Sequence, residues 1–220
     1  MNPILTAGEL PVIADRRQHG APRAGREYSL ERGHPARGRV EDFIARRFLK
    51  VHGARIVQFM PTLLALPGDD GAIRAALGVR DAGLEALFLE HYLDRPVEAI
   101  LAETSGRSAI SRSRIAEIGN LASVDRRASR RLFGILSLYL NAANFEWAVF
   151  TGCGSLRHLF QSLGIETLVL GRALQSRLPV EQQTWGGYYE DNPQVIAGRV
   201  RRGVEVFEIG CNAIGGGLLA

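Results

Sequence analysis

The chain has 220 residues, 46% of them hydrophobic, and a formal net charge of +4. This length supports one substantial core and is short for two domains. No apolar run approaches the ~20 residues of a membrane-spanning helix, and the N-terminal residues lack the basic start and long apolar segment of a signal peptide. These features argue against a membrane-spanning or exported protein, and we expect a cytoplasmic one.

Sulfur and imidazole ligands are sparse in this sequence. The chain contains two cysteines, Cys153 and Cys211, and five histidines. Their spacing matches neither a metal-ligand pattern nor a disulfide framework. The sequence therefore predicts no metal site.

The N-terminal part of the chain divides into an arm and the first regular elements. Residues 1–37 are rich in Pro, Gly and Arg without sustained periodicity, which predicts a flexible arm. Residues 40–48 carry apolar side chains at helical spacing. Residues 54–66 and 73–80 then predict the two strands of a hairpin. Two short helical segments follow and are separated at Pro96.

The most informative stretch, residues 115–164, predicts a strand, a loop, a helix, a second strand and a second helix. Residues 115–122 form a short apolar run, after which a polar loop leads into apolar residues at helical spacing. Residues 147–151 are strand-like, and residues 156–163 give the second helix. A loop rich in N–H groups that follows a strand and opens a helix is an anion site. We therefore expect this loop to bind the phosphate of a nucleotide-type cofactor.

Arginines gather at the start of the first of these two helices. Arg126, Arg127, Arg130 and Arg131 would oppose the helix macrodipole unless an anion is bound nearby. The planar guanidinium group binds phosphates and carboxylates through two parallel hydrogen bonds. A solvated, arginine-rich surface is the alternative interpretation of the same pattern.

The C-terminal part of the chain predicts additional strands. Residues 185–189 and 195–200 flank a turn signal, and residues 204–209 are expected to continue the sheet. Residues 210–220 are expected to form a flexible tail. The whole pattern predicts an α/β domain over residues 38–209, built on a mixed sheet with helices interposed.

Two glutamates with apolar neighbours are candidate catalytic residues. Glu117 lies on the central strand, where desolvation would raise its pKa and let it take a proton from an attacking amine. A core glutamate paired with an arginine is the alternative for this position. Glu90 lies among apolar residues of a helical segment, and its alternative is a solvent-facing position.

Cys153 is a candidate nucleophile because it precedes a predicted helix whose N-terminus would lower the pKa of its thiol. A covalent acyl-enzyme through this cysteine is therefore one interpretation. The other is packing, because small residues in glycine-flanked turns commonly serve it. We favour the second interpretation.

Several blocks of the sequence, met in order, resemble the thermostable haemolysin family. The resemblance covers roughly residues 38–203 and is carried by residues 51–54, 59–63, 87–94, 117–122 and 185–190. The order of elements in residues 115–164 is also similar to the cofactor-binding half of GNAT acyltransferases. That similarity implies a mostly antiparallel central sheet with two splayed parallel strands and flanking helices, and coenzyme A bound along them.

A more distant resemblance links the chain to acyl-homoserine lactone synthases, through residues 78–80, Phe88 and residues 117–120. In those synthases a glutamate is followed three residues later by an arginine, whereas this chain has Glu117 and Asn120. The resemblance implies Glu117 as a base or an acceptor-orienting group, and Arg80 as a contact for the acceptor carboxylate or a structural contact. We expect Glu117 to be the base, with Arg80 or Glu90 orienting the acceptor. The expected donor site comprises Leu121, Ala122, Ser123, Val124, Arg126, Arg127, Arg130, Arg131, Phe150 and Thr151.

Together these features predict an N-acyltransferase without a permanently bound cofactor. Acyl carrier protein or acyl-CoA would donate the acyl group through a phosphopantetheine thioester, and a small amine would accept it. The alternative is a membrane-active or lipid-binding haemolysin-type protein without enzymatic activity, for which peripheral membrane contact is expected. The arginine-rich arm is accompanied by no nucleic-acid reading motif, so no specific nucleic-acid partner is predicted.

Overall fold

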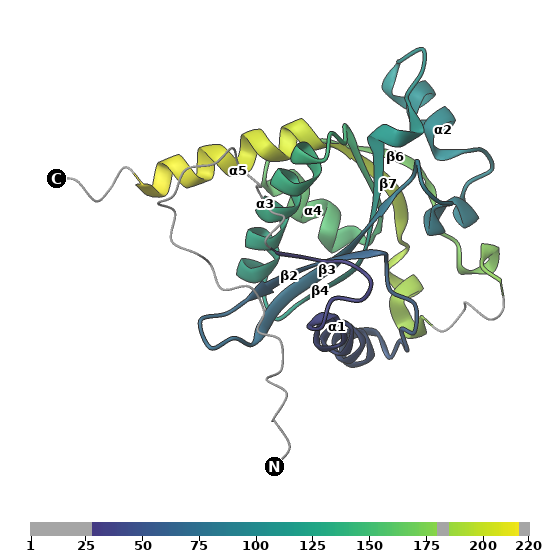
Figure 1. Ribbon diagram of the computed structural model, residues 1–220. Coiled ribbons are helices and arrows are strands. Elements are labelled where there is room, and N and C mark those ends of the chain that lie inside the picture. The colour runs from purple at the N-terminus through teal and green to yellow at the C-terminus, as the bar shows by residue number, and fades with distance from the viewer. Residues whose placement is uncertain (1–27, 180–184, 216–220) are drawn as a thin grey trace.

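Seven strands form one mixed sheet in the order β1-β2-β3-β4-β5-β7-β6 (Figure 1). The computed structural model describes residues 28–179 and 185–215. The strands are β1 (Ser29–Leu30), β2 (Thr62–Pro67), β3 (Ile73–Asp81), β4 (Ile115–Ser123), β5 (Trp147–Gly152), β6 (Thr167–Arg172) and β7 (Gln194–Arg199). All neighbouring pairs are antiparallel except β4 with β5. The predicted mixed, mostly antiparallel sheet is confirmed.

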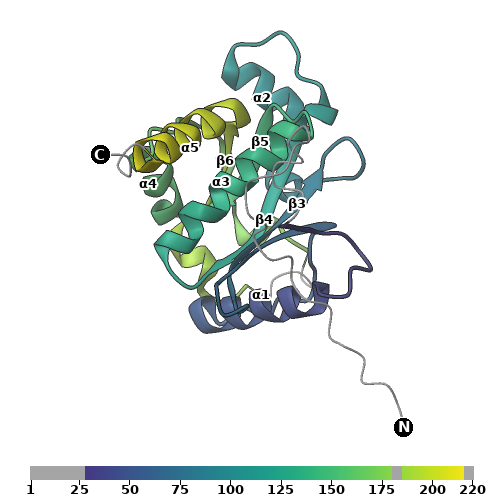
Figure 2. The same cartoon turned by 60° about the vertical axis from the view of Figure 1, so that its left-hand side comes forward.

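Helices cover both faces of the sheet (Figures 1 and 2). On one face lie α1 (Arg37–His52), α2 (Val97–Ser105) and the short 3-10 helix η2 (Phe88–Tyr92). On the other face lie α3 (Arg126–Ala142), α4 (Gly154–Ser162) and α5 (Val200–Gly215). Further 3-10 helices in the described part of the chain are η3 (Arg112–Arg114), η4 (Gln175–Arg177) and η6 (Gly186–Asp191).

The alternation of apolar side chains along the strands explains this layering. In β2, Leu63 and Ala65 pack with α1, whereas Leu64 and Leu66 point to the opposite face and pack with α3. A strand buried on both faces carries apolar residues at every position. The hairpin predicted over residues 54–80 is therefore a central part of the sheet.

The parallel strands β4 and β5 separate after a short paired region. Their last paired residues are Ile118 and Phe150; beyond them β4 stays with β3, and β5 stays with β7. A bulge accompanies the separation, because β4 has one more residue than β3 between Gly119 and Ala122. Asn120 lies within it and adopts a left-handed backbone, with φ of 50°. The splayed pair expected from the GNAT resemblance is thus present.

Three segments differ from the prediction. Residues 185–189 were expected as a strand but belong mostly to η6, and residues 204–209 belong to α5. Valines in the latter segment alternate as in a strand, yet Val206 and Phe207 pack on the core beside α3 as part of a helix. β6 was not predicted.

The ends of the domain also differ from the expected boundaries. Ser29 and Leu30 pair with β2, and Leu30 is buried, so part of the expected flexible arm belongs to the sheet. Helix α5 continues to Gly215, into the segment expected as a tail. Residues 1–27 of the predicted arm and residues 216–220 of the predicted tail lie outside the described residues.

Candidate active site

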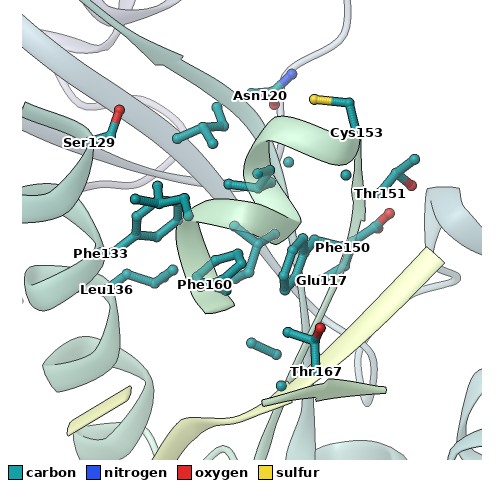
Figure 3. Close-up of a pocket in the computed structure, with 18 of the residues that line it drawn as sticks. Glu117, Asn120, Ser129, Phe133, Leu136, Phe150, Thr151, Cys153, Phe160 and Thr167 are labelled. Carbon is teal, nitrogen blue, oxygen red and sulfur yellow. The ribbon is translucent and has the colours of Figure 1, made fainter. Parts of the chain in front are cut away.

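A cavity of about 620 Å³ lies where β4 and β5 separate (Figure 3). Residues from both faces of the sheet line it. Phe133 and Phe160 come from the face covered by α3 and α4, whereas Phe88 and Glu117 come from the face covered by η2. The cavity therefore spans the gap between the two strands. On the face of α3 and α4 its lining is mostly apolar away from the starts of these helices, and on the other face it includes the charged groups of Arg80 and Glu117.

Glu117 is the buried carboxylate of this cavity. Its side chain is 4% exposed. Its Oε1 accepts a hydrogen bond from the Leu89 backbone N–H at 2.8 Å, and its Oε2 accepts one from the Phe88 N–H at 2.9 Å. Arg80 Nη1 lies 3.6 Å from Oε2. Each carboxylate oxygen has a second lone pair, so these contacts leave acceptor capacity.

Burial raises the pKa of Glu117 above its ordinary value. The two backbone N–H donors and the Arg80 guanidinium act in the opposite direction, but removal of the carboxylate from water is the larger effect. The predicted desolvated glutamate is therefore present in the structure. The alternative prediction for this position is a core glutamate beside an arginine, and the contact with Arg80 fits that prediction too. The geometry of Glu117 therefore agrees with both interpretations.

Arg80 lies next to Glu117 and also lines the cavity. Its Nη1 donates to the Ala86 carbonyl at 3.3 Å, and its Nε lies 3.6 Å from Glu85 Oε2, outside hydrogen-bond distance. The buried Nε has no hydrogen-bond partner in the structure. A buried donor without a hydrogen bond carries a desolvation cost, which the nearby Glu85 carboxylate offsets in part.

Glu90 lies away from the cavity, in an ion pair with Arg112. The two groups form paired hydrogen bonds of 2.6 and 2.7 Å, and Glu90 also accepts from the backbone N–H groups of Leu87 and Val97. The hydrogen bonds from Arg112 lower the pKa of Glu90 to about 2. Glu90 does not line the cavity. These contacts give it a positioning role for η2 and the start of α2.

The predicted donor loop begins helix α3. Asp125 caps this helix, with its Oδ1 accepting from the Ala128 N–H at 2.8 Å. One of the N–H groups expected to meet a phosphate is therefore already bound by a carboxylate. Arg126 and Ser129 line the cavity beside this cap.

The structure brings together four of the ten predicted donor residues as cavity lining: Leu121, Arg126, Phe150 and Thr151. The other six, Ala122, Ser123, Val124, Arg127, Arg130 and Arg131, do not line the cavity. Arg127, Arg130 and Arg131 are exposed on α3. Their positive charge is therefore available at the surface near the cavity rather than inside it.

Aromatic side chains form another part of the cavity wall, and the sequence did not predict them as site residues. Phe48, His52, Tyr188 and Trp185 make a closed circuit of ring contacts with centroid distances of 5.4 to 6.1 Å. All four rings line the cavity. The Tyr188 hydroxyl donates to the Thr151 carbonyl at 3.1 Å, at the point where the strands separate. Burial raises the pKa of this phenol.

Asn120 and Cys153 stand at the opening between the strands (Figure 3). The Asn120 amide accepts from the Met60 N–H at 2.9 Å and donates to the Gln58 carbonyl at 3.3 Å, which fixes the segment before β2 against the bulge. Cys153 precedes α4, and its Sγ lies 3.0 Å from Ser155 Oγ. Its sulfur therefore faces a hydroxyl.

Residues 28–179 and 185–215 contain no cluster of His, Cys, Asp and Glu side chains suited to hold a metal ion. No helix within those ranges is both long and apolar enough to cross a bilayer.

The sequence comparison identifies the family. Residues 30–204 match the family described as thermostable hemolysin. The chain belongs to the thermostable hemolysin family. No curated protein matches this sequence.

Solved structures share the fold of this thermostable hemolysin family member. TofI, crystallised in a ternary complex with an inhibitor and MTA, is 13% identical over 82% of this chain and 95% of its own, with a TM-score of 0.55. FeeM, an N-acyl amino acid synthase from uncultured soil microbes, is 13% identical over 80% and 97%, with a TM-score of 0.52. MesI, a CoA-dependent acyl-homoserine lactone synthase, is 12% identical over 80% and 88%, with a TM-score of 0.51. At this identity the comparisons establish a common GNAT-like fold.

Proposed function

We propose that this thermostable hemolysin family member is an acyltransferase that moves an acyl group from a phosphopantetheine thioester to the amine of a small acceptor. The observation that carries the proposal is the gap between β4 and β5, which joins an apolar arm to a mouth containing a buried carboxylate. A thioester in that gap would have its acyl chain in an apolar environment and its carbonyl near Glu117. The shared fold with acyl-transferring synthases supports the same reaction class by analogy.

Glu117 would act as the general base in direct transfer. The acceptor amine attacks the thioester carbonyl while Glu117 takes one of its protons, directly or through a water molecule. A carbon–nitrogen bond forms, the carbon–sulfur bond breaks, and the thiolate leaves. The raised pKa of Glu117 favours this step, because a base is most effective when its pKa approaches the working pH.

The departing thiolate would be stabilised by a hydrogen bond from the Tyr188 hydroxyl, once that hydroxyl turns from the Thr151 carbonyl to the sulfur. This hydroxyl lies at the opening between the strands, where it donates to the Thr151 carbonyl. Burial keeps the phenol protonated, so it can act as a hydrogen-bond donor to the sulfur. The proton that Glu117 takes from the amine passes through solvent to the thiolate, so the products are the amide and the free thiol, Glu117 is ionised again and Tyr188 keeps its own proton.

The acceptor would bind on the face of Glu117, between Arg80 and the aromatic wall. Arg80 lines the cavity, and its guanidinium group suits a carboxylate or carbonyl of the acceptor. Trp185 and Tyr188 offer flat apolar surfaces beside it. These features favour a small acceptor that carries an amine, an oxygen-bearing group and an apolar portion.

The donor would enter past the beginnings of α3 and α4, where Arg126, Ser129 and Ser155 line the cavity. Because Asp125 already caps α3, the arginines rather than the loop N–H groups would supply most of the attraction for phosphate. An arginine-rich surface would also attract an acidic carrier protein. We therefore propose acyl carrier protein as donor, with acyl-CoA as the alternative.

A reaction assay tests the proposal. The purified full chain is incubated with matched acyl carrier protein and acyl-CoA donors and a mixture of small amines, and free thiol and new amides are measured by mass spectrometry. We expect amide formation that depends on the donor. Thiol release without any amide, or leakage of liposomes without acyl transfer, would overturn the proposal in favour of a hydrolase or a membrane-active protein.

The donor site has its own test. Replacing Arg126 and Arg127 together by Glu should weaken donor binding about tenfold or more at low salt and less at high salt, because the attraction is electrostatic. The same replacement of Arg95, an exposed arginine paired with Glu103, is the control. Equal affinity of the double variant and the control would remove the arginines from the donor site.

A further inference from the structure

The apolar arm of the cavity runs along β5 on the face covered by α3 and α4. Because side chains alternate along a strand, Ala148, Phe150 and Gly152 all face this arm, and all three line it. α3 contributes Leu136 and Leu140 on the other side. The arm therefore extends from the opening between the strands along β5 to Ala148, and Val200, Gly203 and Phe207 of α5 also line it.

Three phenylalanines surround the middle of this arm. The ring of Phe160 lies 5.0 Å from the ring of Phe133 and 5.1 Å from that of Phe150, measured between centroids. In Figure 3 these rings lie between Asn120 and Cys153 at one end and Thr167 at the other. A ligand that reaches the far end must therefore pass along apolar aromatic surface.

The far end of the arm contains free space because a glycine lies there. Gly198 of β7 pairs with Ala148 on one side and with Thr167 on the other, so the three residues form one row across the sheet. Gly198 is buried and lines the cavity, yet a Cβ atom placed on it would meet no atom within 4 Å. Its neighbour Arg199 turns to the opposite face, where its guanidinium lies 4.5 Å from the Trp147 ring. The space in front of Gly198 is thus empty because this residue lacks a side chain.

The register gives the depth of the arm. Three to four residues of β5 separate Ala148 from the opening at Thr151 and Gly152, which corresponds to roughly 10–13 Å at the rise of a strand. Each methylene of an extended chain advances about 1.25 Å, given a carbon–carbon bond of ~1.5 Å at a near-tetrahedral angle. The arm therefore matches about eight to ten carbons.

We propose that this arm holds an acyl chain of medium length and that Gly198 sets its upper limit. The inference rests on the proposed function, because it assumes a thioester at the opening between β4 and β5. The substrate class is then a phosphopantetheine thioester with a linear, saturated acyl chain of about eight to ten carbons. A larger residue at position 198 would shorten the arm.

Binding of phosphopantetheine thioethers tests this proposal without knowledge of the acceptor. S-alkyl phosphopantetheines with chains of two to fourteen carbons are titrated into the full chain by calorimetry. Affinity should rise with length, by up to about fourfold per methylene, and level off near ten carbons. In Gly198→Leu the plateau should move to shorter chains, with the ten-carbon probe weakened at least tenfold and the two-carbon probe unchanged.

A matched control separates the effect of cavity volume from that of the substitution itself. Gly38 lies exposed on α1, and a Cβ atom there also meets nothing within 4 Å, so Gly38→Leu adds the same side chain outside the cavity. This variant should keep the wild-type length profile. Thermal unfolding of both variants checks that they fold, and Gly198→Ala serves where the leucine variant does not.

The outcomes distinguish a wrong role for the apolar arm from a wrong proposed function. Binding of the two-carbon probe with no dependence on length, or a ten-carbon affinity unchanged in the folded position-198 variant, overturns the role of the arm and leaves the proposed transfer standing. Absence of binding at every length overturns the donor site and with it the proposed function.

Discussion

Glu117 and Glu90 fix the same short segment from two sides, yet their environments differ. Glu117 accepts from the N–H groups of Phe88 and Leu89, and Glu90 accepts from those of Leu87 and Val97. Each carboxylate also lies near an arginine. The nitrogen of Arg80 is 3.6 Å from Glu117, whereas Arg112 forms two short hydrogen bonds with Glu90.

The difference between these environments shows which effect sets the pKa of each carboxylate. For Glu117, burial outweighs two backbone N–H donors and a guanidinium that makes no hydrogen bond to it, so the pKa rises. For Glu90, the paired hydrogen bonds of Arg112 lower the pKa to about 2. Glu117 faces the cavity and Glu90 does not. One glutamate is therefore suited to exchange a proton with a substrate, and the other is suited to hold structure.

The largest expected effect separates the two glutamates by activity. Glu117→Gln should lower the turnover of acyl transfer roughly a hundredfold with little change in donor affinity, because it removes the base and keeps the side-chain shape. Glu90→Gln should retain most of the turnover. Steady-state rates of both variants, measured under one donor and acceptor, make the comparison.

A rescue experiment guards this comparison against a folding defect. Glu117→Ala removes the carboxylate and leaves space in the cavity, so added formate should restore part of the turnover if Glu117 acts as a base. Formate should leave Glu90→Ala unaffected. Equal losses in both glutamine variants, with no rescue, would mean that Glu117 acts only by positioning η2.

The sequence predicted the burial of Glu117, which depends on neighbours in the same strand. It did not predict the contacts around Glu117, which depend on residues distant in the chain. A carboxylate within an apolar strand is visible in the sequence, because strand neighbours bury it whatever the rest of the fold. The partner Arg112 is distant from Glu90 in the chain, and only the packing of the η2 segment brings them together. Local spacing contains no signal for such a pair, so Glu90 resembled a second candidate base.

The same contrast between local and long-range contacts explains which elements of the fold were predicted correctly and which were not. The unit over residues 115–164 was predicted correctly because its helices and strands are set by local periodicity. Trp185 and Tyr188 lie in a segment with strand-like composition, but glycines and long-range ring contacts with α1 place them in a 3-10 turn. The aromatic wall was therefore missed, although the family resemblance had included that segment.

A second prediction concerns stability, for which the substitution at Glu90 is the one that matters. Glu90→Gln should lower the free energy of unfolding at neutral pH by about 1–2 kcal/mol, a value reduced for the partial exposure of the ion pair. Because the pKa of Glu90 is depressed in the folded protein, its contribution is present above the unfolded value near 4.5 and is lost as the pH falls toward about 2. Urea unfolding at pH 7 and pH 4 measures it. A larger loss at pH 4 than at pH 7 would contradict the assignment.

A third prediction uses pH to follow Glu117. Its pKa is raised in the folded protein, so the ionised base appears only as the pH rises above the ordinary glutamate value of 4.5. The rate constant kcat/KM should therefore increase with pH along a limb that is absent in Glu117→Gln and present in Glu90→Gln. The same shift has the opposite sign for stability, because a raised carboxyl pKa gives a contribution that declines as the pH rises. A limb that persists in Glu117→Gln would belong to the acceptor amine instead.

The smallest expected effect concerns Cys153, which lines the same cavity as Glu117. If Glu117 activates the amine for direct attack, the thiol has no acyl intermediate to carry, and Cys153→Ala should keep turnover within about threefold of the original, as expected for a side chain outside the chemical step. The contact of its sulfur with Ser155 Oγ is replaceable by water at this half-exposed position. Mass spectrometry of the protein mixed with donor alone provides the complementary readout. An acyl group found on Cys153, together with a large loss in Cys153→Ala, would transfer the central role from the carboxylate to the thiol and reduce Glu117 to the positioning role that Glu90 has.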